Sequence, residues 1–183
     1  IPVILDAKRG DVGSTAELYA QEAFDRYQAD ALTVNPYLGG DTLEPFLNRR
    51  DKGVIILCRT SNPGAADIQN LESKGEKLYR IVARKASQEW NRNGNVLLVV
   101  GATYPQELGE IRSLVESMPF LVPGIGAQGG DVEKAVSQGK TSEGSGLIIN
   151  SSRGIIYAGQ GKDFTQAARK AASQLKDEIN KYR

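Results

Sequence analysis

The segment Phe120–Asp131, FLVPGIGAQGGD, decides the fold. It starts as a short apolar strand and ends where a helical pattern begins, so its four glycines lie between a predicted strand and a predicted helix. Glycines at such a place let backbone amides approach an anion beside the positive end of the helix. The segment lacks the Lys-Ser/Thr pair of a Walker loop, so it predicts a phosphate site of another kind.

Four strand–helix units precede this segment and one follows it. The predicted strands are 1–5, 31–34, 53–58, 96–100, 120–122 and 146–150. The predicted helices begin near residues 15, 41, 78, 105, 131 and 163. Six consecutive βα units indicate a parallel sheet with helices outside it, which is typical of α/β proteins.

Two architectures fit this pattern, an open doubly wound sheet and a closed barrel. An open sheet usually places its Gly-rich loop after the first strand, whereas a barrel places its phosphate site after strands seven and eight. Here the Gly-rich segments follow the fifth and sixth strands. We therefore expect a TIM (β/α)8 barrel, of which this chain holds strands 3–8 with their helices. On this interpretation residues 1–183 form a single barrel domain whose N-terminal two βα units are missing.

The composition excludes several kinds of site. The 183 residues contain no histidine and one cysteine, so neither a Ser-His-Asp triad, a Cys-His pair, a His-ligated zinc nor an internal disulfide is available. A net charge of +1 gives no reason to expect nucleic acid as a partner. No apolar run approaches the ~20 residues that span a bilayer. The lone Cys58 suits a reducing cytoplasm, and we expect it to be a small core residue.

The densest group of charges follows the first predicted strand. Asp6 and Lys8 are two residues apart, so in an extended segment their side chains point the same way, and Asp11 follows after Gly10. A lysine between carboxylates stays charged, stabilises a developing anion and can donate a proton to it. This array predicts the catalytic group, although a solvated strand-to-helix turn has a similar composition.

Further candidates lie after other strands. Gln128 and Gly129 belong to the Gly-rich segment, and Ser152 with Arg153 follows the last strand, where an arginine can hold a phosphate by two parallel hydrogen bonds. Ser61 opens a long polar connection that reaches about Lys77 and that we expect to be an unstructured lid. Asn35 follows the second strand and is expected to line the mouth of the barrel, at the carboxyl ends of the strands, together with the other candidates. A flexible connection or a surface loop is the alternative interpretation of these glycine-rich and polar segments.

At these places the sequence resembles orotidine 5′-phosphate decarboxylases, in particular the branch whose signature reads Asp-Ala-Lys-Arg-Gly-Asp. The matching segments are Asp6–Thr15, Thr33–Tyr37, Thr60–Gly64, Pro123–Asp131 and Ile149–Tyr157.

The resemblance implies decarboxylation of orotidine 5′-phosphate to uridine 5′-phosphate, the last step of pyrimidine synthesis, without metal or organic cofactor. It implies that Lys8 protonates C6 of the pyrimidine and that Asp6 lies beside the departing carboxylate. It also implies a homodimer in which Asp11 and Thr15 reach the neighbouring site. The only partner expected besides the second subunit is the small-molecule nucleotide.

The resemblance assigns the remaining contacts as well. Ser61 would bind the pyrimidine edge, and Gln128 and Arg153 the 5′-phosphate. The family's array has one more lysine and its ribose site one more aspartate, on the two strands that we expect to be missing. Two competing interpretations stay open: a Mg²⁺-dependent sugar-phosphate decarboxylase or aldolase of the same superfamily, and a non-catalytic phosphate-binding barrel fragment.

Overall fold

The computed structural model describes residues 1–125 and 130–183. Within them the chain divides into two compact units, Ile1–Val99 and Val100–Arg183. That residues 1–183 form one barrel domain stays a prediction.

The first unit is built on parallel strands that follow one another in chain order. They are β1 (Ile4–Arg9), β2 (Ala31–Val34), β3 (Gly53–Arg59) and β6 (Val96–Val100), the last of which ends on the first residue of the second unit. Val54, Ile55 and Ile56 of β3 are fully buried, as expected for a strand covered on both faces. The prediction that Cys58 is a core residue is confirmed, since it is buried and its thiol donates a hydrogen bond to the carbonyl of Tyr79.

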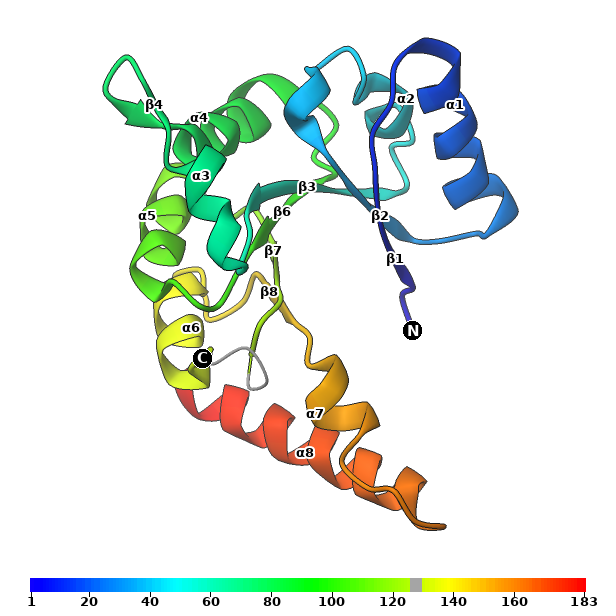
Figure 1. Ribbon diagram of the computed structural model, residues 1–183, viewed down its shortest axis with the longest axis vertical. Helices are drawn as coiled ribbons and strands as arrows, with labels where there is room; N and C mark the ends of the chain where they lie inside the picture. The colour runs from blue at the N-terminus through cyan, green and yellow to red at the C-terminus, as the bar shows by residue number, and fades with distance from the viewer. Residues whose placement is uncertain (126–129) are drawn as a thin grey trace. The chain divides into compact units, whose positions relative to one another are not determined.

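Two helices of the first unit lie side by side next to β1 and β2 (Figure 1). They are α1 (Gly13–Gln21), which continues as the π-helical turn η1 (Glu22–Arg26), and α2 (Glu44–Leu47), which follows the 3₁₀ turn η2 (Pro36–Leu38). Helix α4 (Leu78–Lys85) likewise continues as a π-helical turn, η4 (Ala86–Trp90). The predicted helices of this unit are therefore present, and two of them change geometry in their last turns.

The first strand differs from its prediction. It was expected over residues 1–5, but it begins at Ile4 and extends to Arg9, because pairing with β2 continues as far as Arg9 opposite Val34. The register shifts between Leu5 and Arg9. As a result Asp6 and Lys8 lie within the strand rather than after it.

The connection between β3 and α4 was expected to be unstructured, and this is wrong. It contains the 3₁₀ turn η3 (Pro63–Ala65), helix α3 (Ala66–Gln69) and a hairpin of β4 (Glu72–Ser73) with β5 (Glu76–Lys77). Lys74 and Gly75 both have positive φ, 54° and 77°, which is the conformation that closes a two-residue hairpin. This polar stretch therefore has secondary structure of its own.

The second unit contains the parallel pair β7 (Phe120–Val122) and β8 (Leu147–Ile149). Its helices are α5 (Pro105–Val115), α6 (Val132–Gly139), α7 (Ser152–Ile156) and α8 (Phe164–Tyr182). Helix α8 passes along α6 and α7 (Figure 1). The sequence of α8 repeats apolar residues at helical spacing, which predicts one buried face. This prediction is wrong for the described residues, since none of the side chains of α8 is buried and Phe164 is 55% exposed. Helices α6 and α7 cover only part of its apolar stripe.

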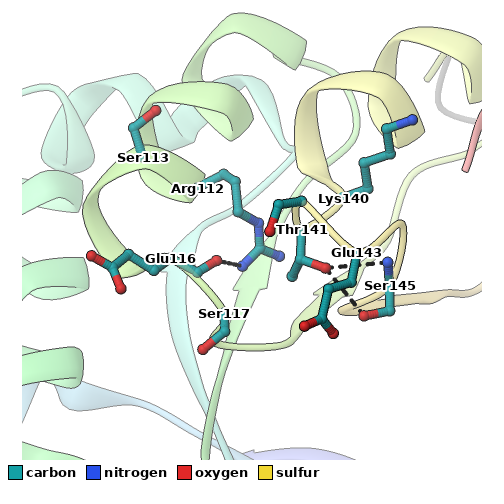
Figure 2. A pocket seen from close by; sticks show the side chains of 9 residues that line it. Arg112, Ser113, Glu116, Ser117, Lys140, Thr141, Glu143 and Ser145 are labelled. Carbon is teal, nitrogen blue, oxygen red and sulfur yellow. Dashed lines mark hydrogen bonds between the residues drawn. The ribbon is translucent and has the colours of Figure 1, made fainter.

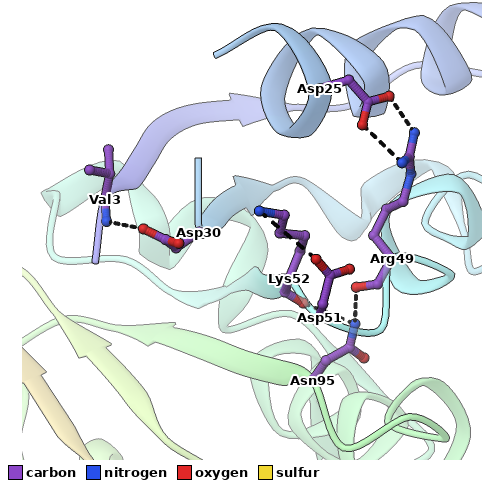
Figure 3. A network of polar contacts seen from close by, with 7 residues as sticks. All are labelled: Val3, Asp25, Asp30, Arg49, Asp51, Lys52 and Asn95. Atoms are coloured by element: carbon purple, nitrogen blue, oxygen red, sulfur yellow. Dashed lines mark hydrogen bonds and ion pairs between the residues drawn. The ribbon is translucent and has the colours of Figure 1, made fainter. Parts of the chain in front are cut away.

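Polar contacts hold the amino ends of the strands in the first unit (Figure 3). The side-chain amide of Asn95, just before β6, donates to the carbonyls of Leu47, Arg49 and Lys52 at 3.1–3.2 Å. Arg49 in turn binds both carboxylate oxygens of Asp25 at 2.9 and 2.7 Å. Networks at this end of a barrel strand typically serve stability rather than chemistry.

Arg112 has the same role in the second unit (Figure 2). Its guanidinium donates to four backbone carbonyls that surround the starts of β7 and β8, those of Glu116, Met118, Gly139 and Gly146. Burial lowers the pKa of Arg112 to about 10, which leaves it charged at neutral pH. A cavity of about 590 Å³ lies beside Arg112, but N–H groups of its guanidinium already donate to these carbonyls.

Candidate active site

The charged pair predicted from the sequence is present in β1. Lys8 Nζ lies 2.6 Å from Asp6 Oδ1, and the two side chains are 49% and 57% exposed. The prediction that they point to the same side is therefore confirmed. Exposed charges at the carboxyl end of a strand are available to a ligand.

The geometry that joins them is not that of a regular strand. Lys8 has φ +49°, and the register of β1 on β2 shifts at this point. A left-handed backbone costs about 1–2 kcal/mol for a residue with a side chain, and such strain gathers at functional sites. The surrounding contacts must therefore hold Lys8 in place.

Thr33 provides these contacts and was not among the predicted site residues. It lies in the middle of β2 and is fully buried. Its hydroxyl accepts a hydrogen bond from the backbone N–H of Lys8 and donates one to Asp6 Oδ1, both at 2.9 Å. The available signal was one hydroxyl in the otherwise apolar strand ALTV, next in the sheet to the charged cluster.

Arg9 is directed toward the helices instead. Its guanidinium donates to Glu22 Oε2 at 2.9 and 3.1 Å and stacks over the ring of Tyr19 at 4.8 Å. Arg9 therefore anchors the end of β1 to α1 and η1.

Asp11 and Thr15 follow at the start of α1. Asp11 is half-buried and one of its carboxylate oxygens accepts the N–H of Val12 at 2.8 Å, while Thr15 is exposed. Within residues 1–125 and 130–183, neither forms a hydrogen bond or ion pair with Asp6 or Lys8. The structure of the first unit thus places these two residues near the strand end but not in the charged pair.

Asn35 lies against the end of β1. Its backbone N–H donates to the carbonyl of Arg9 at 2.8 Å, and its side-chain oxygen accepts the N–H of Tyr37 at 3.0 Å. A Cβ at Gly10 would come within 3.3 Å of Asn35 Cβ, so glycine permits this close approach. Asn35 and the charged segment are therefore brought together.

The loop that carries Ser61 is fixed by Gln69 of α3. The side-chain oxygen of Gln69 accepts the N–H of Thr60 at 3.0 Å, and its amide donates to the Thr60 hydroxyl at 2.9 Å. The buried Arg59 donates to the same Gln69 oxygen at 3.2 Å. Thr60 and Asn35 line one cavity of about 850 Å³ in this unit, so the loop and the end of β2 face a common space.

Gln128 and Gly129 lie outside the described residues. Gly124 and Gly130, which lie on either side of residues 126–129, are in contact, because the N–H of Gly130 donates to the carbonyl of Gly124 at 3.1 Å. A Cβ at Gly130 would lie 2.6 Å from that oxygen, so only glycine fits. Asp131 caps α6: its carboxylate accepts the N–H of Lys134 at 3.0 Å, and this bond lowers its pKa.

Ser152 and Arg153 form the first turn of α7 and are both exposed. In the described part of the chain, the Arg153 guanidinium has no ion-pair partner. Ser152 and Arg153 are therefore open to solvent near the carboxyl end of β8.

Two features are absent from the described ranges. Residues 1–125 and 130–183 contain no cluster of three or more His, Cys, Asp or Glu side chains suited to a metal ion. Nor does any helix there have the length and apolar character needed to cross a membrane.

The sequence matches the family described as "Orotidine 5′-phosphate decarboxylase / HUMPS family" over residues 1–171. The chain belongs to this family. The orotidine 5′-phosphate decarboxylase of Azoarcus sp. (strain BH72) is 62% identical over the whole chain, and that of Dechloromonas aromatica (strain RCB) is 61% identical. The chain spans 68% of the length of each of these relatives.

Solved structures of the family agree. The chain is similar to the OMP decarboxylase of Leishmania donovani, with a TM-score of 0.87 and 43% identity over 98% of this chain and 69% of that one. It is also similar to the UMP synthase of Leishmania donovani, with a TM-score of 0.89 and 45% identity over 98% of this chain and 40% of that one. The prediction of a TIM-barrel fold, present in part, is confirmed.

Family membership also bears on the chemistry. It supports a lyase that decarboxylates orotidine 5′-phosphate in pyrimidine synthesis, and it does not favour the Mg²⁺-dependent alternative.

Proposed function

We propose that the protein decarboxylates orotidine 5′-phosphate to uridine 5′-phosphate and that Lys8 carries the chemistry. The observation that supports this most is the 2.6 Å contact of Lys8 Nζ with Asp6 Oδ1 in a strand of a decarboxylase-family chain. Both side chains are about half exposed, so a ligand can reach them.

Lys8 acts on the anion that forms when carbon dioxide leaves. Cleavage of the bond between C6 and the carboxylate leaves its electron pair on C6, where the pyrimidine ring does not delocalise it. The ammonium of Lys8 stabilises this pair more than it stabilises the neutral carbon of the substrate, which is the condition for catalysis. One N–H proton then moves to C6, giving the product and a neutral amine that solvent reprotonates.

Asp6 has two roles in this proposal. It holds the ammonium by a charge-assisted hydrogen bond and lies beside the departing carboxylate of the substrate. The hydroxyl of Thr33 on the same oxygen supports a fixed orientation of the Asp6 carboxylate.

Gln128, Gly129, Ser152 and Arg153 are proposed to bind the 5′-phosphate. The exposed guanidinium of Arg153 suits two parallel hydrogen bonds to phosphate oxygens, with Ser152 adding a hydroxyl. Binding of this remote group supplies free energy that orders the reacting groups.

Ser61 and Asn35 are proposed to contact the nucleoside. The Ser61 loop is held by Gln69, and Asn35 is held by the end of β1, so both present polar groups from a fixed backbone. Preorganised polar groups of this kind distinguish a pyrimidine from other bases at little entropic cost.

The active form is proposed to be a homodimer in the cytoplasm, with Asp11 and Thr15 reaching the site of the second subunit. Two exposed apolar residues near them, Val12 at 57% and Leu18 at 62%, suit a contact surface. The single cysteine is consistent with a reducing compartment.

The test is release of labelled carbon dioxide from carboxyl-labelled orotidine 5′-phosphate by the full-length protein, with and without a metal chelator. We expect release in both samples. Loss of activity in chelator would favour the Mg²⁺-dependent alternative. Binding of uridine 5′-phosphate without any release would identify a non-catalytic phosphate-binding barrel.

A further inference from the structure

A buried hydroxyl lies behind the charged pair. Thr33 is fully buried, and its neighbours in β2, Leu32 and Val34, are buried and apolar. A hydroxyl in such surroundings is unfavourable unless it forms hydrogen bonds. The bonds that Thr33 makes therefore account for its presence in this strand.

Both bonds of Thr33 go to the pair that the proposed function uses. Its hydroxyl oxygen accepts a hydrogen bond from the backbone N–H of Lys8, and its O–H donates a hydrogen bond to Asp6 Oδ1. Each donor–acceptor distance is 2.9 Å. The same Asp6 oxygen receives Lys8 Nζ at 2.6 Å. One hydroxyl thus contacts the backbone of the lysine and the side chain of its carboxylate partner.

The backbone explains why a side chain is needed there. The register of β1 on β2 shifts between Leu5 and Arg9, and Lys8 within this interval has φ +49°. At a register shift the regular ladder of backbone hydrogen bonds is interrupted. The N–H of Lys8 donates to the Thr33 side chain, which satisfies it while Lys8 keeps its left-handed conformation.

We propose that Thr33 is a positioning residue that sets the geometry of the Asp6–Lys8 pair for decarboxylation. It acts from the neighbouring strand through two hydrogen bonds and, being fully buried, does not itself present atoms to a ligand. This inference rests on the proposed function, because it assigns Thr33 a role in the reaction of Lys8.

The test compares three substitutions in the full-length protein. Thr33→Val keeps the branched shape and removes the hydroxyl, whereas Thr33→Ser keeps the hydroxyl. Thr42→Val is the matched control, because Thr42 is also a buried threonine of the first unit and its hydroxyl donates to the Gly39 carbonyl, away from the Asp6–Lys8 pair.

We expect Thr33→Val to lower kcat by about 10- to 100-fold, since small errors in the placement of reacting groups have effects of this size. The KM for orotidine 5′-phosphate and the Kd of uridine 5′-phosphate should change by less than about twofold, because the binding groups lie elsewhere. Thr33→Ser should have a kcat within about threefold of wild type, and Thr42→Val should have the kcat of wild type.

Several results would overturn the inference. An unchanged kcat in Thr33→Val would do so, and so would equal kcat losses in Thr33→Val and Thr33→Ser. A parallel loss of kcat and product affinity would show a role in folding alone. If Thr33→Val does not fold, Thr33→Cys replaces it, since a thiol is a weak hydrogen bonder. Its kcat must then fall clearly below that of Thr33→Ser, and equality contradicts the proposal.

Failure of the proposed function is a separate result. If wild-type protein does not release carbon dioxide, the proposed function is wrong, and if Lys8→Ala releases it about as fast as wild type, the role proposed for Lys8 is wrong. If both behave as proposed while Thr33→Val is fully active, only the role of Thr33 is refuted.

Discussion

Lys8 Nζ and Asp6 Oδ1 lie 2.6 Å apart, although Lys8 leaves the regular strand conformation with φ +49°. The contact joins two residues that are separated by one position in the sequence. It is supported from the neighbouring strand by Thr33 and from the following turn by the close packing of Gly10 on Asn35. The pair is therefore held by the fold and not only by its mutual attraction.

Asp6→Asn should remove the charge that orients the Lys8 ammonium while keeping a similar shape. We expect kcat to fall by about 10²-fold or more, with uridine 5′-phosphate affinity nearly unchanged, as measured by steady-state kinetics and calorimetry. Asp51→Asn is the control, because Asp51 also neighbours a lysine, at 4.0 Å, in the turn before β3. A variant Asp6→Asn with wild-type kcat would remove Asp6 from the mechanism.

The proposed dimer predicts complementation between two inactive variants. In a mixed dimer of Lys8→Ala and Asp11→Asn subunits, one site would contain both an intact Lys8 and an intact Asp11 from the other subunit. Half of randomly reassociated dimers are mixed and each has one such site, so activity should recover to about a quarter of wild type. Mixtures that stay inactive although the subunits exchange would show that Asp11 serves its own site.

Arg153→Met should weaken nucleotide binding through the phosphate. A hydrogen bond to a charged group contributes about 1.5–3 kcal/mol, so the Kd of uridine 5′-phosphate should rise by about 10- to 150-fold. The Kd of uridine, which has no phosphate, should not change. Arg169→Met in α8 is the control, since Arg169 is also exposed in the second unit. Equal effects on uridine and its phosphate would contradict the assignment.

Cys58 makes stability depend on alkaline pH. Burial raises the pKa of its thiol from 9.0 to about 12. The folded protein therefore keeps the proton in this interval while the unfolded chain loses it. Because the unfolded state binds fewer protons, the free energy of unfolding falls as pH rises above 9.0, by up to about 1.4 kcal/mol per pH unit.

This decline should be absent in Cys58→Ala. Urea unfolding at a series of pH values above neutrality should show the free energy of unfolding of wild type falling more steeply than that of the variant. The difference between the two proteins isolates the thiol, since their other titrating groups are shared. Parallel curves would show that the thiol titrates alike in both states.

Much of the fold could be predicted because its signals are local. The apolar run of β3, the glycines after β7 and the periodic pattern of α5 each reflect burial or backbone freedom at known positions. The boundaries of β1 could not be predicted, because its last residues are charged and do not resemble a strand. They belong to the strand because they pair with β2, and the sequence of β1 alone does not reveal this pairing.

The site shows the same division. Asp6 and Lys8 were predicted from their spacing, but the reason they meet is a register shift and a threonine 27 and 25 positions away. The structured connection between β3 and α4 was missed because its order comes from Gln69, whose contact with Thr60 spans nine positions. Contacts between elements, rather than composition, decide these features.

The most direct test of the central claim is carbon dioxide release by Lys8→Ala in the full-length protein, beside its affinity for uridine 5′-phosphate. Lys74→Ala is a matched control, because Lys74 has φ 54°, close to that of Lys8, but lies in the exposed hairpin turn. We predict that Lys8→Ala lowers turnover by at least about 10³-fold while product affinity stays within about threefold of wild type. Turnover near that of Lys74→Ala would contradict the account.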